Sequence, residues 1–387
     1  MDKSALAVSG TTFFFYGTLC HAPLLTAVLG REVAMRPARL ADHAVHWVAD
    51  HAFPMILSRA GAEAAGVVVE GLDATDIERL DFYEGGFDYA THAVTAEADG
   101  TRIAARVYIA SADRLRPGAP WRLADWVDRY GAVAVLAAGR FMQGFGTVPP
   151  GEAWRRYPAM LVTAASRLRA AVAAPTGLRR AAAAGDIDVM HHAEPYAQFF
   201  SVEEFDLRHR RFDGAMSGEM RRAVFMSGDA ATVLPYDPVR DRVMLIEQFR
   251  AGPFGRGDPQ PWMLEPIAGR IDPGETPEMA ARREAVEEAG ITLGVLLKAG
   301  EYYPSPGLLA EYLYSYVGLA DLPDDSAGMG GLPEEHEDIR AHLLSFDDLM
   351  ALVDSGEVQI APLLVTIYWL AANRARLRAE AGVVAAS

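Results

Sequence analysis

Four charged residues have the types and spacing of a metal site. Glu284, Glu287 and Glu288 lie three or four positions apart, so a helix places their carboxylates on one face, with Arg283 beside them. So many like charges on one face lower stability unless a cation offsets them. Mg²⁺ prefers one or two carboxylates together with water and substrate phosphates. The spacing therefore indicates a divalent-cation site, although a solvated acidic helix face has the same composition.

The ends of this helix are marked in the sequence. Thr276 is an N-cap residue by type, Pro277 suits the first helical position, and Gly290 ends the helix. Gly269 and Gly274, in the preceding loop, let the backbone approach a metal and a phosphate closely. Because the loop, the cap and the carboxylate spacing agree, they favour a metal site over a solvated face.

Residues 269–291 resemble the Nudix box position for position. The matching residues are Gly269, Glu275, Arg283, Glu284, Ala285, Glu287, Glu288, Gly290 and Ile291. The resemblance implies the Nudix fold, an α/β/α sandwich with a mixed sheet between helices. It also implies hydrolysis of a nucleoside diphosphate linked to another moiety, with Mg²⁺ as the cofactor and Mn²⁺ as the alternative ion.

The resemblance extends beyond the box, over residues 194–376, to the ADP-ribose pyrophosphatase branch of the Nudix family. Pro306 follows the box at the spacing typical of this branch, and residues 332–339 are similar to its catalytic loop. Residues 247–250 and 216–222 also match. Leu308 departs from the pattern, because a second glycine is expected after Gly307.

The resemblance implies a role for each matching position. The metal ligands are the Ala268 carbonyl, Glu284, Glu288 and Glu337. The catalytic base is Glu335, with Glu287 in support. The substrate contacts are Arg222 and Arg250 on the phosphates, Pro306, and Phe199 stacked on adenine from this chain or a partner subunit. The alternatives are that Arg250 is a surface residue, that Phe199 is a core residue, and that Glu335 shares its role with Glu334. Glu275 is expected to order the loop.

The amino-terminal third contains many short strands and few helices, which predicts a small barrel-like domain. Residues 12–19 read as a strand that enters a glycine turn, and residues 80–85 end a helix. Over residues 11–112 the chain resembles the gamma-glutamylcyclotransferase-like (AIG2-like) family, through residues 16–19, residues 80–85 followed by Tyr89, and a strand ending at Tyr108. The resemblance implies a carboxylate-binding loop of Tyr16, Gly17, Thr18 and Leu19. It makes Glu84 a general acid and base, whereas simple packing of Tyr16 and Glu84 is the alternative.

The chain as a whole has 387 residues, which suggests two or three domains. We expect the barrel domain at 11–112, a helical segment with an Ala-rich linker at 113–193, and the Nudix domain at 194–376, an α+β or α/β organisation. The tryptophans of the middle segment are expected to pack in the core. Residues 171–190 read as the linker, a strand is expected from Phe199, and residues 328–333 read as a flexible loop. The adjacent pair His191 and His192 does not indicate a metal clip.

Charge and cysteine content limit the function classes. The formal net charge of −16 argues against general nucleic-acid binding. The single cysteine, Cys20, excludes an internal disulfide framework and fits a reducing compartment. No apolar run reaches the length of a membrane span, and no signal-peptide core follows Met1, so we expect a cytoplasmic protein without a membrane partner.

The favoured reaction is ADP-ribose plus water giving AMP and ribose 5-phosphate. Another nucleoside diphosphate sugar or a dinucleotide is the alternative substrate, and a ligand sensor with both sites inert is the alternative function. The amino-terminal domain is either a gamma-glutamyl-amine cyclotransferase or a binding module. The family resemblance implies a homodimer through the Nudix domain. The two-domain layout resembles tellurite-resistance-associated Nudix proteins.

Overall fold

The structure of the chain is a computed structural model that describes residues 10–85, 89–110, 115–172, 174–198, 200–332 and 337–385. The chain divides into two compact units, Met1–Ala173 and Ala174–Ser387. Each unit has hydrophobic cores of its own. In the described part of the chain, no helix is both long and apolar enough to cross a membrane.

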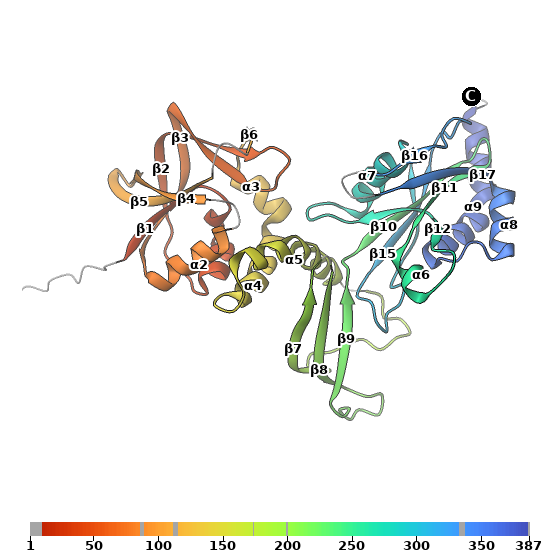
Figure 1. The fold of residues 1–387 in the computed structure, drawn as a ribbon, viewed down its shortest axis with the longest axis horizontal. Coiled ribbons are helices and arrows are strands. Elements are labelled where there is room, and N and C mark those ends of the chain that lie inside the picture. Colours follow the sequence, from red (N-terminus) through yellow and green to blue (C-terminus); the bar gives the residue numbers. More distant parts are fainter. Residues whose placement is uncertain are drawn as a thin grey trace, which may run out of the picture. The chain divides into compact units, whose positions relative to one another are not determined.

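The amino-terminal unit is built on a β-sheet that closes into a barrel, as the sequence predicted (Figure 1). Its strands are β1 (Thr11–Phe15), β2 (Arg36–Val48), β3 (Pro54–Leu72), β4 (Tyr89–Ala98), β5 (Thr101–Ala110) and β6 (Pro117–Pro120). The strand order is β3-β1-β5-β4-β2-β6, and an additional pairing of β3 with β2 closes the ring.

Strand β1 explains how one short apolar run serves two cores. Phe14 and Tyr16 belong to the core cluster inside the barrel, whereas Phe13 and Phe15 belong to the cluster shared with the helices. Successive side chains of a strand point to opposite faces, so burial on both faces requires the continuous apolar sequence observed here. The strand ends at Phe15, earlier than expected, because a 3₁₀ turn at Thr18–Cys20 follows it.

The helices of this unit pack on the outer side of β1. They are α1 (Ala22–Leu29), α2 (Ala74–Glu84), α3 (Leu123–Trp126), a π-helical turn (Val127–Gly131), α4 (Ala132–Phe141) and α5 (Pro150–Ala170), with a 3₁₀ turn at Met142–Gly144. The middle segment is therefore part of this unit's core, where Trp121, Trp126 and Trp154 pack as predicted. Asp73 caps α2 through a capping box with Asp76.

The carboxy-terminal unit begins with a separate antiparallel sheet of three strands in the order β7-β8-β9. These are β7 (Ile187–Ala197), β8 (Ser201–His209) and β9 (Met220–Met226). β7 begins inside the stretch predicted to be linker, so only the described residues up to 186 lack a helix or strand. His191 and His192 lie in β7, where neighbouring side chains point to opposite faces. His192 instead pairs with buried Glu203, Nε2 to Oε2 at 2.9 Å.

A mixed sheet of eight described strands forms the centre of this unit. The strands are β10 (Ala230–Asp237), β11 (Arg242–Phe249), β12 (Trp262–Glu265), β13 (Ile267–Arg270), β14 (Leu296–Tyr302), β15 (Leu313–Leu319), β16 (Met329–Gly330) and β17 (Ile339–Ser345). The main order is β14-β15-β10-β11-β17-β16, with β12 beside β11 and β13 beside β10. β16 lies inside the stretch that was predicted to be a flexible loop.

Helices cover both faces of this sheet, which confirms the α/β/α sandwich (Figure 1). Helix α7 (Pro277–Ala289) packs on one face, against a core that includes Val233, Met244 and Ile246. Helices α8 (Phe346–Ser355) and α9 (Ala361–Ala385) pack on the other face, against Leu234 and Leu245. A short helix, α6 (Ala251–Arg256), connects β11 to β12.

Candidate active site

Helix α7 has the boundaries that its sequence predicted. The Thr276 hydroxyl accepts a hydrogen bond from the backbone N–H of Met279 at 3.2 Å, which is an N-cap contact. Gly290 ends the helix in the left-handed conformation, with φ of 64°. The small face of the helix, formed by Ala280, Ala281 and Ala285, is fully buried against the sheet. This packing fixes the direction in which the carboxylates project.

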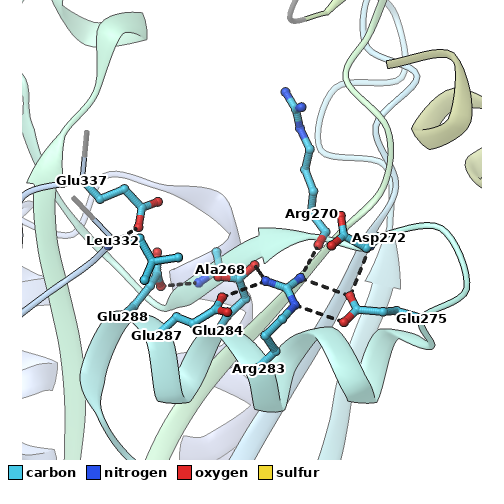
Figure 2. Close-up of polar contacts among 10 residues, drawn as sticks. All are labelled: Ala268, Arg270, Asp272, Glu275, Arg283, Glu284, Glu287, Glu288, Leu332 and Glu337. Atoms are coloured by element: carbon cyan, nitrogen blue, oxygen red, sulfur yellow. Dashed lines mark hydrogen bonds and ion pairs between the residues drawn. The ribbon is translucent and has the colours of Figure 1, made fainter. Parts of the chain in front are cut away.

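Arg283 is the centre of the polar network on α7 (Figure 2). Its Nη1 donates to Glu284 at 2.7 Å and to Glu287 at 2.9 Å, and its Nε donates to Glu275 at 3.0 Å. Burial alone would lower the pKa of Arg283, but these carboxylates raise it above its usual value. Glu275 also accepts from the backbone N–H of Asp272, so it orders the loop before α7 as expected.

The backbone of β13 passes directly over the carboxylates of α7. The N–H of Ala268 donates to Glu288 Oε2 at 3.0 Å, and Glu288 is 2% exposed. A Cβ on Gly269 would lie 1.7 Å from Glu284 Oε1, so the Glu284 carboxylate can hold this position only beside a residue without a side chain. The predicted ligands Ala268, Glu284 and Glu288 are thus brought together by two elements that are adjacent in the sequence.

Glu337 joins the cluster from a distant part of the chain (Figure 2). Its carboxylate accepts from the backbone N–H of Leu332 at 3.2 Å, and its own N–H donates to the Leu332 carbonyl at 3.3 Å. A Cβ on Gly330 would lie 1.9 Å from the Glu288 carbonyl oxygen, and Gly331 has φ of 94°. These two glycines let the chain pass against α7, a role that sequence reasoning missed because it depends on a contact between distant residues.

The charges of this cluster fit a divalent cation. Burial raises the pKa of Glu284 to about 7, with Glu287 and Glu337 adding to the effect. Burial likewise raises the pKa of Glu288 to about 8, and Glu284 and Glu337 add to it. Crowded, partly buried carboxylates with too little positive charge are the donor set that hard cations stabilise. Among the described residues, no three acidic, histidine or cysteine side chains already converge as a closed metal site. The carboxylates instead accept from Arg283 and from backbone N–H groups.

Arg250 lies at the end of β11, on the side of the sheet that faces α7. Its guanidinium binds Glu265 through two hydrogen bonds, Nε to Oε1 at 2.8 Å and Nη2 to Oε2 at 2.5 Å. Burial alone would lower the pKa of Arg250, but Glu265, Glu288 and Glu337 raise it. Sequence reasoning assigned Arg250 to the phosphates and overlooked Glu265, whose pairing depends on the register between two strands.

Two predicted substrate contacts, Arg222 and Pro306, are exposed and lie on or beside β9. Arg222 is exposed on β9, where its Nη1 donates to the carbonyl of Arg221 at 2.9 Å. Pro306 is exposed in a turn that is fastened to the end of β9, because Phe225 donates to the Leu308 carbonyl at 2.9 Å. Among the described residues no contact joins Arg222 to the carboxylates of α7. Phe199 and Glu335 lie outside the described residues.

The amino-terminal unit places its predicted site residues at the end of β1. Tyr16 and Leu19 are buried, whereas Gly17 and Thr18 form the turn between them. A Cβ on Gly17 would lie 2.8 Å from the side chain of Pro54, so this turn requires a residue without one. Burial raises the pKa of Tyr16, and the charge of Glu84 adds to it, so these two predicted residues lie within electrostatic range.

Glu84 is the last residue of α2, and its charge acts on three tyrosines, Tyr16, Tyr108 and Tyr157. Burial raises the pKa of Glu84 to about 8. Its charge in turn raises the pKa of Tyr108 and of Tyr157, for each of which burial is the larger cause. Tyr108 donates to Asp81 at 2.7 Å, and the hydroxyls of Tyr83 and Tyr157 are 3.1 Å apart. Tyr157 comes from α5, so the helical segment contributes to the surroundings of Glu84.

Two family models match the chain. The model of gamma-glutamyl cyclotransferase, AIG2-like, matches residues 13–128, and the NUDIX domain model matches residues 226–364. The two matches thus fall in the two structural units, and the second contains α7 and Glu337.

Known proteins resemble the carboxy-terminal half. The ADP-ribose pyrophosphatase of Escherichia coli (strain K12) is 39% identical over 195 residues, which cover 50% of this chain and 92% of that protein. The GDP-mannose pyrophosphatase of Enterobacter sp. (strain 638) is 32% identical over 177 residues, 45% of this chain and 91% of that protein. A crystal structure described as an ADP compounds hydrolase is 20% identical and has a TM-score of 0.39, covering 50% of this chain and 98% of that chain.

Proposed function

Because this chain belongs to the Nudix family, we propose that its carboxy-terminal half hydrolyses ADP-ribose to AMP and ribose 5-phosphate in the presence of Mg²⁺ or Mn²⁺. The family makes the protein a hydrolase of pyrophosphate bonds. The observation that carries the proposal is that Glu284, Glu288 and Glu337 lie within electrostatic range of one another, with Glu288 bonded to the Ala268 backbone. The similarity to an ADP-ribose pyrophosphatase over nearly its whole length supports this choice of substrate.

Each proposed site residue has its own role in the reaction. The Ala268 carbonyl, Glu284, Glu288 and Glu337 would hold the divalent cation. When bound, that cation supplies charge neutralisation on the phosphate oxygens. Glu335, which lies outside the described residues, is assigned by its place in the catalytic-loop resemblance as the general base that removes the proton of the attacking water. Arg250 binds the substrate's phosphates through its remaining N–H groups.

Glu287 has a supporting role. Its carboxylate accepts from Arg283 at 2.9 Å, and Arg283 in turn fixes Glu284 at 2.7 Å. Glu287 therefore limits how far the Arg283 guanidinium can move, and with it the position of a proposed metal ligand. Removing such a neighbour of a ligand costs about 10- to 100-fold in metal affinity or activity.

A panel of nucleotides assayed with and without Mg²⁺ tests the proposal. We expect AMP release from ADP-ribose only when the cation is present. Glu288→Gln should lower turnover by about 100-fold or more, since losing a mere neighbour of a metal ligand already costs about 10- to 100-fold. Glu380→Gln is the matched control, because Glu380 forms an exposed pair with Arg376 on α9. Wild-type protein that cleaves no substrate of the panel would remove the proposal, and normal turnover of Glu288→Gln would remove the ligand assignment.

The same panel decides between ADP-ribose and the alternative substrates. GDP-mannose belongs in it because a GDP-mannose pyrophosphatase is 32% identical to this half. Leu308 gives a further reason to include it, because this exposed leucine replaces a glycine that the ADP-ribose branch is expected to carry. Preference for GDP-mannose or a dinucleotide would keep the reaction class and change only the substrate.

For the amino-terminal domain, we propose a gamma-glutamyl-amine cyclotransferase activity with Glu84 as the general acid and base. The support is the pKa of about 8 that burial gives Glu84, which suits proton transfer near neutral pH. The Gly17–Leu19 turn, next to Tyr16, would receive the substrate carboxylate. Release of 5-oxoproline from gamma-glutamyl amines, abolished in Glu84→Gln, is the expected result. No release from the wild-type protein would leave this domain a binding module.

A further inference from the structure

We propose that Glu265 is a positioning residue that fixes the Arg250 guanidinium for the substrate's pyrophosphate, an inference that rests on the proposed function of the Nudix half. Glu265 lies on β12 and contributes no predicted metal ligand or base. Its side chain is 9% exposed, whereas that of Arg250 is 41% exposed. The Glu265 carboxylate is therefore buried, whereas the Arg250 guanidinium that it binds reaches the surface.

Arg250 is held at two points. Its backbone N–H donates to the Pro261 carbonyl at 2.9 Å, which fixes the start of the side chain. Its Nε and Nη2 donate to the two oxygens of Glu265 at 2.8 and 2.5 Å, which fixes the plane of the guanidinium. These two bonds occupy the Nε–Nη2 edge of the guanidinium, and the Nη1 group does not take part in the pairing with Glu265. Within the described residues Nη1 has no acceptor, so it is available to an anion.

The strand register directs this pair toward the metal cluster. Glu265 lies opposite Ile246 in the β11–β12 pairing, and Ile246 packs in the core beneath α7. Side chains two positions apart on a strand share a face, so Gln248 and Arg250 lie on the α7 side as well. Gln248 donates to Glu265 at 3.4 Å. The charges of Glu288 and Glu337 also act on Arg250, which places its guanidinium within electrostatic range of the proposed ligands.

Fixing the arginine before the substrate arrives improves binding for an entropic reason. A free arginine side chain loses rotamer freedom when it binds a phosphate, and a guanidinium that is already fixed loses less. Glu265→Gln keeps the shape of the side chain but replaces one acceptor oxygen with an N–H₂ group that faces an arginine donor. Because hydrogen bonds to charged groups are strong, we expect kcat/KM to fall by about 10- to 100-fold.

A double-mutant cycle separates positioning from a general structural role. We expect Glu265→Gln to lower kcat/KM for ADP-ribose in the wild-type background but to have little further effect in an Arg250→Ala background. A purely structural loss would lower kcat/KM by the same factor in both backgrounds. Equal factors, or an unchanged kcat/KM in Glu265→Gln, would overturn the proposal. Glu265→Asp, whose carboxylate is one methylene group farther from the Arg250 guanidinium, gives a second route to the same cycle if Glu265→Gln fails to fold.

A control variant and a binding measurement complete the experiment. Asp241→Asn breaks another arginine–carboxylate pair, with Arg374, in the same unit, so it should lower Tm while its effect on kcat/KM adds to that of Arg250→Ala. The affinity for ADP, measured by calorimetry in the four proteins of the cycle, does not require hydrolysis. Coupling in ADP affinity without hydrolysis by the wild type would sustain the role of Glu265 and reject the proposed function. Hydrolysis without coupling would do the reverse.

Discussion

Replacement of Gly269 by alanine tests the geometry of the metal cluster with a single methyl group. The added Cβ would lie 1.7 Å from Oε1, 2.0 Å from Cδ and 2.7 Å from Cγ of Glu284. All three atoms belong to a flexible side chain, so Glu284 will rotate away from β13 and the backbone will stay in place. Gly269 does not have a positive φ, so alanine is not strained there. The variant therefore moves one proposed metal ligand without a change to that residue.

Two opposite effects follow from this displacement. Glycine to alanine at a compatible position stabilises the folded state by about 0.4–1 kcal/mol through the unfolded chain. Loss of the Arg283–Glu284 contact at 2.7 Å, which is partly buried, removes about 1.5–3 kcal/mol, somewhat more than this gain. We therefore expect Tm to change by only a few degrees. Loss of a residue beside a metal ligand costs about 10- to 100-fold in metal affinity. In this variant the ligand itself has moved, so we expect metal affinity to fall by at least this much.

The assay is AMP release from ADP-ribose as a function of Mg²⁺ concentration, with Tm measured in parallel. We expect the Mg²⁺ concentration for half-maximal rate to rise and the rate at saturating Mg²⁺ to recover in part. Gly255→Ala is the matched control, since open space surrounds Gly255 on α6 and the activity should not change. A Gly269→Ala protein with the wild-type Mg²⁺ dependence would refute the placement of Glu284 at the metal.

Two further predictions follow from burial in the amino-terminal unit. Burial raises the pKa of Glu84 from 4.5 to about 8, so between these pH values the folded protein holds a proton that the unfolded chain has lost. The free energy of unfolding should thus fall as pH rises through this window, by at most about 1.4 kcal/mol per pH unit. Between pH 5 and 8, the Tm of Glu84→Gln should therefore change less with pH than the Tm of the wild type. Equal slopes in both proteins would contradict this. Burial also raises the pKa of Cys20 to about 12, and its thiol donates to the Phe15 carbonyl at 3.1 Å. Because only the thiolate reacts, iodoacetamide should modify Cys20 roughly 100-fold more slowly in the native than in the unfolded protein. Comparable rates would show that Cys20 is accessible.

Local patterns in the sequence predicted the elements that depend on neighbouring residues. The boundaries of α7 follow from Thr276 and Gly290, whose effects act within one helical turn. The proximity of Arg283 to Glu284 and Glu287 follows from helical spacing alone. The carboxylates Glu284 and Glu288 could be assigned to one face for the same reason, and the structure confirms the helix and its contacts.

Contacts between distant residues could not be predicted in the same way. Glu265 binds Arg250 because β12 pairs with β11 in one particular register, and a register is not visible in either strand alone. Gly330 approaches Glu288 only after β16 joins the sheet, so its sequence reads simply as loop. The strand β7 was missed because its alanine-rich approach resembles a linker. Each of these depends on tertiary structure.

Closure of the amino-terminal sheet makes the two units differ in their tendency to aggregate. In the described part of that unit, β3 pairs with both β1 and β2, and the strand left at the end of the order, β6, has 4 residues and a proline at each end, so little hydrogen-bonding edge remains to recruit strands from other molecules. The three-stranded sheet of the other unit ends at β7, where Ile187, Val189 and Met190 are 61%, 51% and 40% exposed. Intermolecular aggregation during heating or refolding should therefore start at β7, and charged substitutions on that outer strand are the first choice for a more soluble variant.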